Sequence, residues 1–334
     1  MAYITLNKNN FFNNLNIIAN RTKGKDKIAL VLKDNAYGHG LVEIAQMAQE
    51  YGITKAIVRC QVEADMVEKY FEYILVLNEI PLIASDKIRY TINDINSISK
   101  FPKDTKVELK VDTGMSRNGI STEQLQDAIL KIKEQSLKLE AVFTHHRSAD
   151  ELTSEWFWQN ENFKKIKKEL ASLKDMRFHS ANSASLFRTT NFDEDIARVG
   201  IAAYGCIDGF NDVGLKPVLS LFAIKNSTRE LKKGDKIGYG SSYKMQEDNL
   251  VSNYDFGYGD GFLRACSNNY TTPNGIKIVG RISMDNSSFL SDKDELLIFN
   301  DAREVAISAK TISYEILTSL KSYMKRNIIF HQNE

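Results

Sequence analysis

The chain is poor in cysteine and proline, carries almost no net charge and lacks long apolar runs. Cys60, Cys206 and Cys266 are odd in number and widely spaced, with no CxxC pair, so a disulfide framework and a zinc site are both disfavoured and a reducing cytoplasm fits. Lys and Arg total 44 against 43 Asp and Glu, which leaves no broad basic field for nucleic acid. No apolar run is long enough to span a bilayer, and the N-terminus is too short and too polar for a secretory signal. We therefore expect a cytoplasmic protein that binds neither nucleic acid nor membrane.

The 334 residues, 43% of them hydrophobic, suffice for two domains or for one large barrel with a smaller unit. From about residue 8 to residue 200, short β-type runs alternate with amphipathic stretches, which predicts a parallel sheet that is either open or closed into a barrel. The expected strands are Ile28–Leu32, Lys55–Val58, Tyr73–Leu77, Lys106–Val111, Leu139–Thr144 and Arg177–His179. The expected helices lie near residues 9–22, 41–51, 61–71, 122–134 and 155–173.

The pattern changes after about residue 215, where short strand-like runs predominate. These runs are Leu219–Ile224, Lys236–Tyr239, Leu250–Phe256, Ile276–Ile282 and Glu295–Ile298. Helical patterning returns only around Ser308–Leu320. We expect residues 8–215 to form the first domain, and residues 1–7 and 216–334 to form a β-rich second domain.

The positions of polar residues favour a barrel over an open sheet. Lys33, Asp112, His145 and Asn182 each follow the carboxyl end of a predicted strand. Barrels assemble their active sites at these strand ends, whereas an open sheet concentrates its site at one switch point. The predicted fold class is therefore α/β, a (β/α)8 TIM-like barrel followed by a C-terminal β-rich domain.

The most informative segment is Lys33-Asp34-Asn35-Ala36-Tyr37-Gly38-His39-Gly40, directly after a buried strand. Desolvation favours the neutral amine of a lysine at such a place, and the neutral amine is the form that attacks carbonyls or forms an imine with pyridoxal phosphate. The alternative is a strand end whose ammonium group lies in solvent.

Further segments also allow more than one interpretation. Arg117 offers a planar fork of donors for a carboxylate, or belongs with Lys110 to a surface salt-bridge network. Ser183 either binds a phosphate near a helix N-terminus or caps that helix. Arg198, within an apolar stretch, needs a partner, which could be an acidic neighbour. The adjacent His145 and His146 point to opposite faces if both lie in a strand, which argues against a shared metal ion.

Together these segments resemble those of the alanine racemase family, in the same order along nearly the whole chain. The Lys33 segment resembles the family's cofactor-lysine motif, with Asp34 where a small residue is usual. The segment 110–119 resembles KxDTGMxRxG, and His145 matches a family histidine, although His146 and Arg147 depart from the aromatic and small residues that usually follow it. Further resemblances lie at 179–185, 197–205, 238–243, 257–261, 281–285 and 311–315.

The resemblance implies a role for each candidate residue. Lys33 would carry pyridoxal 5′-phosphate as an imine, and Arg198 would donate to the cofactor's pyridine nitrogen, which makes the ring a weaker electron sink and suppresses transamination. Arg117 would contact the cofactor's O3′ and the substrate carboxylate, and Lys110 could be carbamylated and pair with Arg117. The other implied cofactor-binding residues are Tyr37, Asn182, Ser183, Gly200, Ile201 and Tyr314, and the other implied substrate-binding residues are Tyr258 and Met284.

The implied activity is the interconversion of L- and D-alanine, which supplies D-alanine for peptidoglycan. Two bases would act on opposite faces of the external aldimine, Lys33 on the D-enantiomer and Tyr239 on the L-enantiomer. Since a free tyrosine has a pKa of about 10, Tyr239 needs help, and the neighbourhood of His145 and Arg198 is the candidate. In the family, the tyrosine and methionine matched by Tyr239 and Met284 reach the site from the other subunit, so the resemblance implies an obligate homodimer.

Three alternatives stay open at this stage. One is a racemase of different or broader specificity, for serine or basic amino acids. Another is a non-catalytic barrel protein that only carries pyridoxal phosphate, although such proteins lack a β-rich domain. A related decarboxylase of basic amino acids would carry a glycine-rich phosphate loop and a reactive cysteine segment, neither of which is evident.

Overall fold

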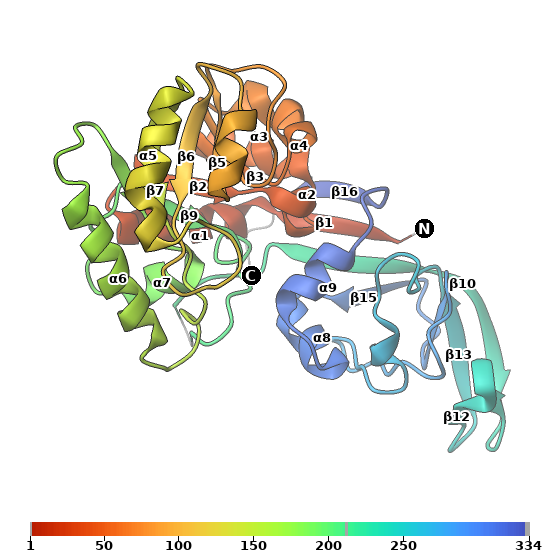
Figure 1. Ribbon diagram of the computed structural model, residues 1–334. Coiled ribbons are helices and arrows are strands. Elements are labelled where there is room, and N and C mark those ends of the chain that lie inside the picture. Colours follow the sequence, from red (N-terminus) through yellow and green to blue (C-terminus); the bar gives the residue numbers. More distant parts are fainter. Residues whose placement is uncertain (1, 211–212, 331–334) are drawn as a thin grey trace.

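Eight parallel strands form the sheet of the N-terminal part in the computed structural model, which describes residues 2–210 and 213–330 (Figure 1). In chain order they are β2 (Ile28–Val31), β3 (Lys55–Val58), β4 (Tyr73–Val76), β5 (Ile88–Ile92), β6 (Lys106–Lys110), β7 (Lys138–Phe143), β8 (Arg177–His179) and β9 (Ala197–Val199). The hydrogen-bonded order is β8-β7-β6-β5-β4-β3-β2-β9, and a parallel bridge between Asn182 and Arg198 brings the two ends together. The sheet is thus a nearly closed barrel, and the predicted fold class is confirmed.

Helices cover the outside of this barrel, so its strands are apolar on both faces. All four residues of β2 and of β4 are buried. The helices are α1 (Lys8–Thr22), α3 (Leu41–Tyr51), α4 (Gln61–Val67), α5 (Leu125–Glu134), α6 (Glu155–Glu169) and α7 (Ser183–Arg188). Short 3-10 turns at η1 (Lys25–Lys27), η2 (Glu68–Tyr70), η3 (Ile95–Lys100) and η4 (Thr122–Gln124) complete the connections.

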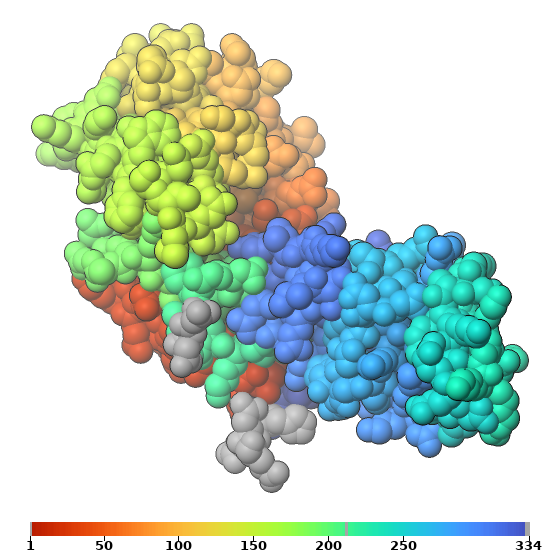
Figure 2. All heavy atoms as spheres, turned by 90° about the horizontal axis from the view of Figure 1, so that it is seen from below, coloured from red at the N-terminus to blue at the C-terminus, as the bar shows by residue number. Residues whose placement is uncertain are grey.

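The C-terminal part is a strand-rich lobe beside the barrel (Figure 2). Its main sheet has the order β14-β13-β10-β1-β16, with β15 also paired to β10. The strands are β1 (Tyr3–Asn7), β10 (Leu219–Leu231), β13 (Asn249–Tyr254), β14 (Ser287–Phe289), β15 (Glu295–Phe299) and β16 (Lys325–Ile329). A separate hairpin joins β11 (Lys236–Ile237) to β12 (Tyr243–Lys244), and the helical elements are η5 (Tyr239–Ser241), η6 (Arg264–Cys266), α8 (Ala302–Ala309) and α9 (Ser313–Ser319).

Several predicted elements were wrong or missing. The barrel strands β5 and β9 were not predicted, because an arginine in the interior of each interrupts its apolar run. The predicted helix 308–320 is two helices, since Lys310 adopts a left-handed conformation with φ 54° between them. The predicted strand 276–282 makes only isolated bridges, and Tyr239 lies in a 3-10 turn rather than in a strand. Among the described residues, no helix is both long and apolar enough to cross a bilayer.

Candidate active site

A cavity of about 700 Å³ opens at the carboxyl end of the barrel strands. The candidate residues that line it are Lys33, Tyr37, Lys110, Arg117, His145, Asn182, Ser183, Arg198, Gly200, Ile201 and Tyr314. They follow strands β2, β6, β7, β8 and β9, or belong to those strands, except for Tyr314, which comes from α9 of the C-terminal part. The structure therefore brings together residues that lie up to 281 positions apart in the sequence, counting from Lys33 to Tyr314.

Lys33 is half-buried and begins an unusual left-handed turn, α2 (Lys33–Tyr37). Asp34, Asn35 and Ala36 have φ values of 54°, 57° and 51°. A left-handed conformation costs a non-glycine residue roughly 1–2 kcal/mol, so the turn depends on contacts from outside it. The sequence analysis did not predict that the residues between Lys33 and Gly38 would be left-handed.

The carboxylate of Glu63, on α4, supplies the main contact of this kind. Its Oε1 accepts hydrogen bonds from the backbone N–H of Asp34 at 2.7 Å and of Asn35 at 3.4 Å, and its Oε2 accepts one from the N–H of Arg59 at 2.7 Å. The Arg59 guanidinium also pairs with the Asp34 carboxylate at 3.3 Å. Glu63 thus fixes the turn that begins at Lys33.

We expect Glu63→Ala to lower the free energy of unfolding by about 2 kcal/mol, because it leaves strained backbone donors without a charged acceptor. Urea unfolding of the purified protein measures this. Glu72→Ala, which removes an exposed carboxylate from the same strand–helix unit, is the matched control and should change stability by less than about 0.5 kcal/mol. Equal stability of the two variants would show that Glu63 does not hold the turn.

Backbone and hydroxyl groups form a cradle on the other side of the cavity. Ser183 Oγ accepts hydrogen bonds from the N–H of Gly200 at 3.2 Å and of Ala202 at 3.3 Å. The sequence left open whether Ser183 caps α7, but the cap is Asn182, whose side chain accepts from Ser185 N at 2.9 Å. Amide donors and a hydroxyl at a helix start favour an anion.

Two tyrosines close this cradle. The rings of Tyr37 and Tyr314 have centroids 5.7 Å apart. A Cβ atom on residue 200 would lie 2.7 Å from the Tyr37 hydroxyl oxygen, so only glycine allows this approach. Burial raises the pKa of both tyrosines above its ordinary value, so both keep their protons at neutral pH.

Arg198 is buried beneath the cavity and holds its charge without a carboxylate contact among the hydrogen bonds that the described residues make. Its Nη2 donates to the carbonyl oxygens of Thr144 at 2.7 Å and Ser180 at 3.1 Å, and its Nη1 contacts His179 Nδ1 at 2.7 Å. Burial lowers the pKa of Arg198 to about 10, which leaves it protonated at neutral pH. The acidic neighbour that the sequence left open as a partner of Arg198 is absent from these hydrogen bonds, and carbonyl and imidazole acceptors take its place.

The contact with His179 fixes the tautomer of that ring. Arginine can only donate, so His179 Nδ1 accepts and the proton lies on Nε2. Nε2 then donates to the fully buried carboxylate of Glu108 at 2.9 Å. Burial lowers the pKa of His179, so the ring is neutral. Its two nitrogens link the Glu108 carboxylate to the Arg198 guanidinium through hydrogen bonds.

His145 lies on the other side of Arg198, with Nδ1 3.4 Å from Arg198 Nη2. The same argument gives it a protonated Nε2, and burial followed by the charge of Arg198 lowers its pKa well below the ordinary value. His146 turns to different partners, with Nδ1 2.7 Å from Ser185 Oγ and its ring against Trp156. The two histidines therefore do not converge on one point.

Lys110 and Arg117 form a cationic wall of the cavity. Lys110 is only 8% exposed, and burial, followed by the charges of Arg117 and Arg198, lowers its pKa to about 8. Arg117 is exposed on the loop that follows β6. Arg59, Asp34 and Arg147 also line the cavity, although the sequence had not singled them out as site residues. Each of the three is a charged residue within four positions of the end of a barrel strand, and this pattern could have identified it.

Three predicted residues do not reach this cavity in their own chain. Tyr239, Tyr258 and Met284 are 67%, 42% and 56% exposed. Their segments adjoin one another in the C-terminal part, where Gly259 N donates to the carbonyl oxygen of Met284 at 2.8 Å and Gly240 lies against the Arg281 side chain. The hairpin strand β12, just after Tyr239, is at the far end of that part from the barrel (Figure 1).

Comparison with known proteins accounts for both halves of the chain. The family model "Alanine racemase, N-terminal domain" matches residues 6–208, and "Alanine racemase, C-terminal domain" matches residues 218–328. The chain belongs to the alanine racemase family. The second match also argues against a cofactor carrier made of a barrel alone, because the racemase family's C-terminal domain is present.

Relatives in this family match along the whole chain. The alanine racemases of a Nitratiruptor species and of Campylobacter curvus are 42% and 40% identical, with 98% of this chain and 100% of each relative covered. The solved alanine racemase of Clostridium difficile 630 is 28% identical, with a TM-score of 0.90 over 98% of this chain and 95% of that one. A solved alanine racemase from Bartonella henselae, 27% identical with a TM-score of 0.84 over 98% and 99% of the two chains, carries covalently bound pyridoxal phosphate.

Proposed function

We propose that this protein interconverts L-alanine and D-alanine with pyridoxal 5′-phosphate as its cofactor. The observation that carries the proposal is that one cavity contains Lys33 at a strand exit, the anion cradle at Ser183 and Gly200, and the buried cation Arg198. Membership of the alanine racemase family supports alanine as the substrate.

The residues present fit this cofactor. The cradle of Ser183, Gly200 and Ile201, with the Tyr314 hydroxyl, would hold the phosphate, and Arg198 would donate to the pyridine nitrogen. Tyr37 and Asn182 shape the cradle around them. When bound, pyridoxal phosphate supplies an electron sink that weakens the Cα–H bond of the amino acid.

Arg198 limits the chemistry to proton movement. It does not readily give up its proton, so the nitrogen that it faces stays largely unprotonated and the sink stays weak. His179 and Glu108 hold the guanidinium in place from below. Arg117 would bind the substrate carboxylate through its planar fork and contact the cofactor's O3′.

Two bases would move the proton on opposite faces of the substrate. Lys33 Nζ would take it from D-alanine, and the Tyr239 hydroxyl would take it from L-alanine. His145 is neutral and presents Nε2–H, which can stabilise a tyrosine oxygen that has lost its proton. Because Tyr239 lies outside its own chain's cavity, it would enter the cavity of a second subunit together with Met284 and Tyr258.

The protein would therefore be a homodimer whose active sites are each completed by the partner chain. We also propose the division into a domain of residues 8–215 and a domain of residues 1–7 and 216–334, which the pairing of β1 with β10 and β16 supports. A cytoplasmic location and the supply of D-alanine for peptidoglycan fit this activity.

Lys110 is expected to form a carbamate with CO₂, which would turn a cation into an anion that pairs with Arg117. The reactive form is the neutral amine, and a pKa of about 8 makes that form abundant near pH 8. At a fixed concentration of dissolved CO₂, the carbamate should increase as pH rises through about 8. A ¹³C NMR signal from labelled bicarbonate measures it, with Lys110→Ala as the control. No signal above that control at pH 8 would contradict the expectation.

A racemisation assay across alanine, serine and lysine tests the proposed function. Alanine should be turned over with the highest kcat/KM. A clear preference for serine or lysine would favour the alternative, a racemase of different specificity, and the absence of turnover with all three would contradict the proposal.

A further inference from the structure

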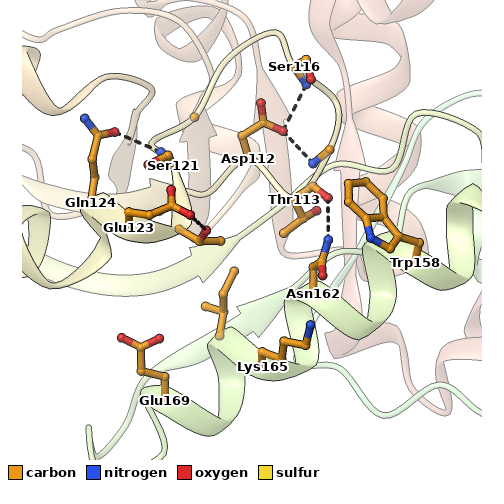
Figure 3. A pocket seen from close by; sticks show the side chains of 14 residues that line it. Asp112, Thr113, Ser116, Ser121, Glu123, Gln124, Trp158, Asn162, Lys165 and Glu169 are labelled. Carbon is orange, nitrogen blue, oxygen red and sulfur yellow. Dashed lines mark hydrogen bonds between the residues drawn. The ribbon is translucent and has the colours of Figure 1, made fainter.

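The loop after β6 contributes Met115 and Arg117 to the cavity. Its outer face, which includes Asp112, Thr113 and Ser116, lies towards α6 (Figure 3). Asp112 Oδ1 accepts hydrogen bonds from the N–H of Gly114 at 2.8 Å and of Ser116 at 3.1 Å, which shapes the loop. Between this outer face and α6 lies a groove of about 720 Å³. Contacts between this loop and its surroundings can therefore influence the position of Arg117.

Three side chains of α6 reach the loop directly, and two of them, Trp158 and Asn162, are drawn in Figure 3. Gln159 Nε2 donates to Thr113 Oγ1 at 3.4 Å. Asn162 Nδ2 donates to the carbonyl oxygen of Thr113 at 3.4 Å. The Trp158 ring lies on Gly114, where a Cβ atom would approach it to 2.2 Å. The two hydrogen bonds are long and end on Thr113, and the Trp158 contact is apolar, so none of the three fixes the direction of the Gly114 carbonyl.

Arg147 provides a further attachment, which is charged and ends on Gly114 itself. Its Nη1 donates to the carbonyl oxygen of Gly114 at 2.8 Å, while its Nη2 forms an ion pair with Glu155 at the start of α6. Its own backbone is anchored, because its N–H donates to the fully buried Gln159 at 2.9 Å. One guanidinium thus joins the loop to the helix through two donors of fixed relative direction.

We propose that Arg147 is a positioning residue for Arg117: it holds the Gly114 carbonyl and, through it, the loop that presents Arg117 to the substrate carboxylate. The inference rests on the proposed function for the role of Arg117. Its side chain is 39% exposed, and such ion pairs add little to global stability, so its effect falls on geometry.

Ligand binding to the protein loaded with pyridoxal phosphate tests this by calorimetry. Propionate carries the carboxylate without the amine, and ethylamine carries the amine without the carboxylate. Arg147→Ala should weaken propionate binding about tenfold, since a small displacement of a binding group has effects of this size, and should change ethylamine binding by less than about twofold. Arg147→Lys should recover part of the loss, because an ammonium group reaches one of the two acceptors. Lys164→Ala, which removes an exposed charge of α6 that pairs with Glu161, is the control and should change neither.

Arg117→Lys, measured in parallel, tests the carboxylate-binding role of Arg117 separately from the positioning role of Arg147. If Arg117→Lys loses propionate selectively and Arg147→Ala does not, the inference is wrong while the proposed function stands. If neither variant discriminates between the ligands, the carboxylate role of Arg117 fails and the inference fails with it. If Arg147→Ala weakens both ligands equally and lowers the melting temperature, its role is only structural and the inference is again wrong.

Discussion

Lys33→Ala is expected to lower kcat for alanine racemisation by about 10³-fold or more, because in the proposed mechanism Lys33 is both the amine that binds the cofactor and one of the two bases. The visible absorption of the lysine-bound cofactor should disappear from the purified protein. Assays in both directions and an absorption spectrum measure these effects. Lys138→Ala, at the opposite end of a barrel strand, is the control and should keep both colour and activity. If the Lys33→Ala protein racemises alanine at the rate of the unmodified protein, Lys33 is neither the cofactor-binding amine nor a required base.

Tyr239→Phe is expected to remove the base for the L-enantiomer and leave the other in place. Racemisation has an equilibrium constant of one, so kcat/KM must fall equally in both directions, by about 10³-fold. Exchange of the Cα proton with D₂O, followed by NMR, separates the two faces: L-alanine should lose exchange while D-alanine keeps it through Lys33. Tyr243→Phe, in the same hairpin, is the control. Normal exchange of both enantiomers in Tyr239→Phe would mean that the second base is another residue.

Most of the barrel site could be predicted because strand ends are local features of a sequence. Lys33, Asp112, His145 and Asn182 each follow a predicted strand, and a closed parallel sheet brings such positions to one edge. Lys33, His145 and Asn182 line the cavity, whereas Asp112 lines the groove beside it. Strand β9 was not predicted in this way, because Arg198 lies in its interior and interrupts the apolar run. The burial of that arginine depends on carbonyl acceptors from Thr144 and Ser180, which no sequence pattern displays.

Other features depend on contacts between distant segments. The left-handed turn after Lys33 is stabilised by Glu63 from α4, and the local Asp34-Asn35 pattern alone does not predict it. Whether Ser183 capped α7 or remained free to bind an anion was decided by the neighbouring Asn182. The roles of His146 and Arg147 became visible only when α6 and α7 were placed beside them.

We propose above all that each active site combines Lys33 of one chain with Tyr239 of another. Mixing inactive Lys33→Ala and Tyr239→Phe proteins in equal amounts, after mild dissociation and reassembly, tests it most directly. Random pairing makes half of the dimers mixed, and each mixed dimer contains one site with both residues intact, so about a quarter of the unmodified activity should return. If both residues acted within one chain, every site in the mixture would still lack one of them. No recovery of activity, in a mixture that mass spectrometry shows to contain mixed dimers, would therefore contradict the shared site.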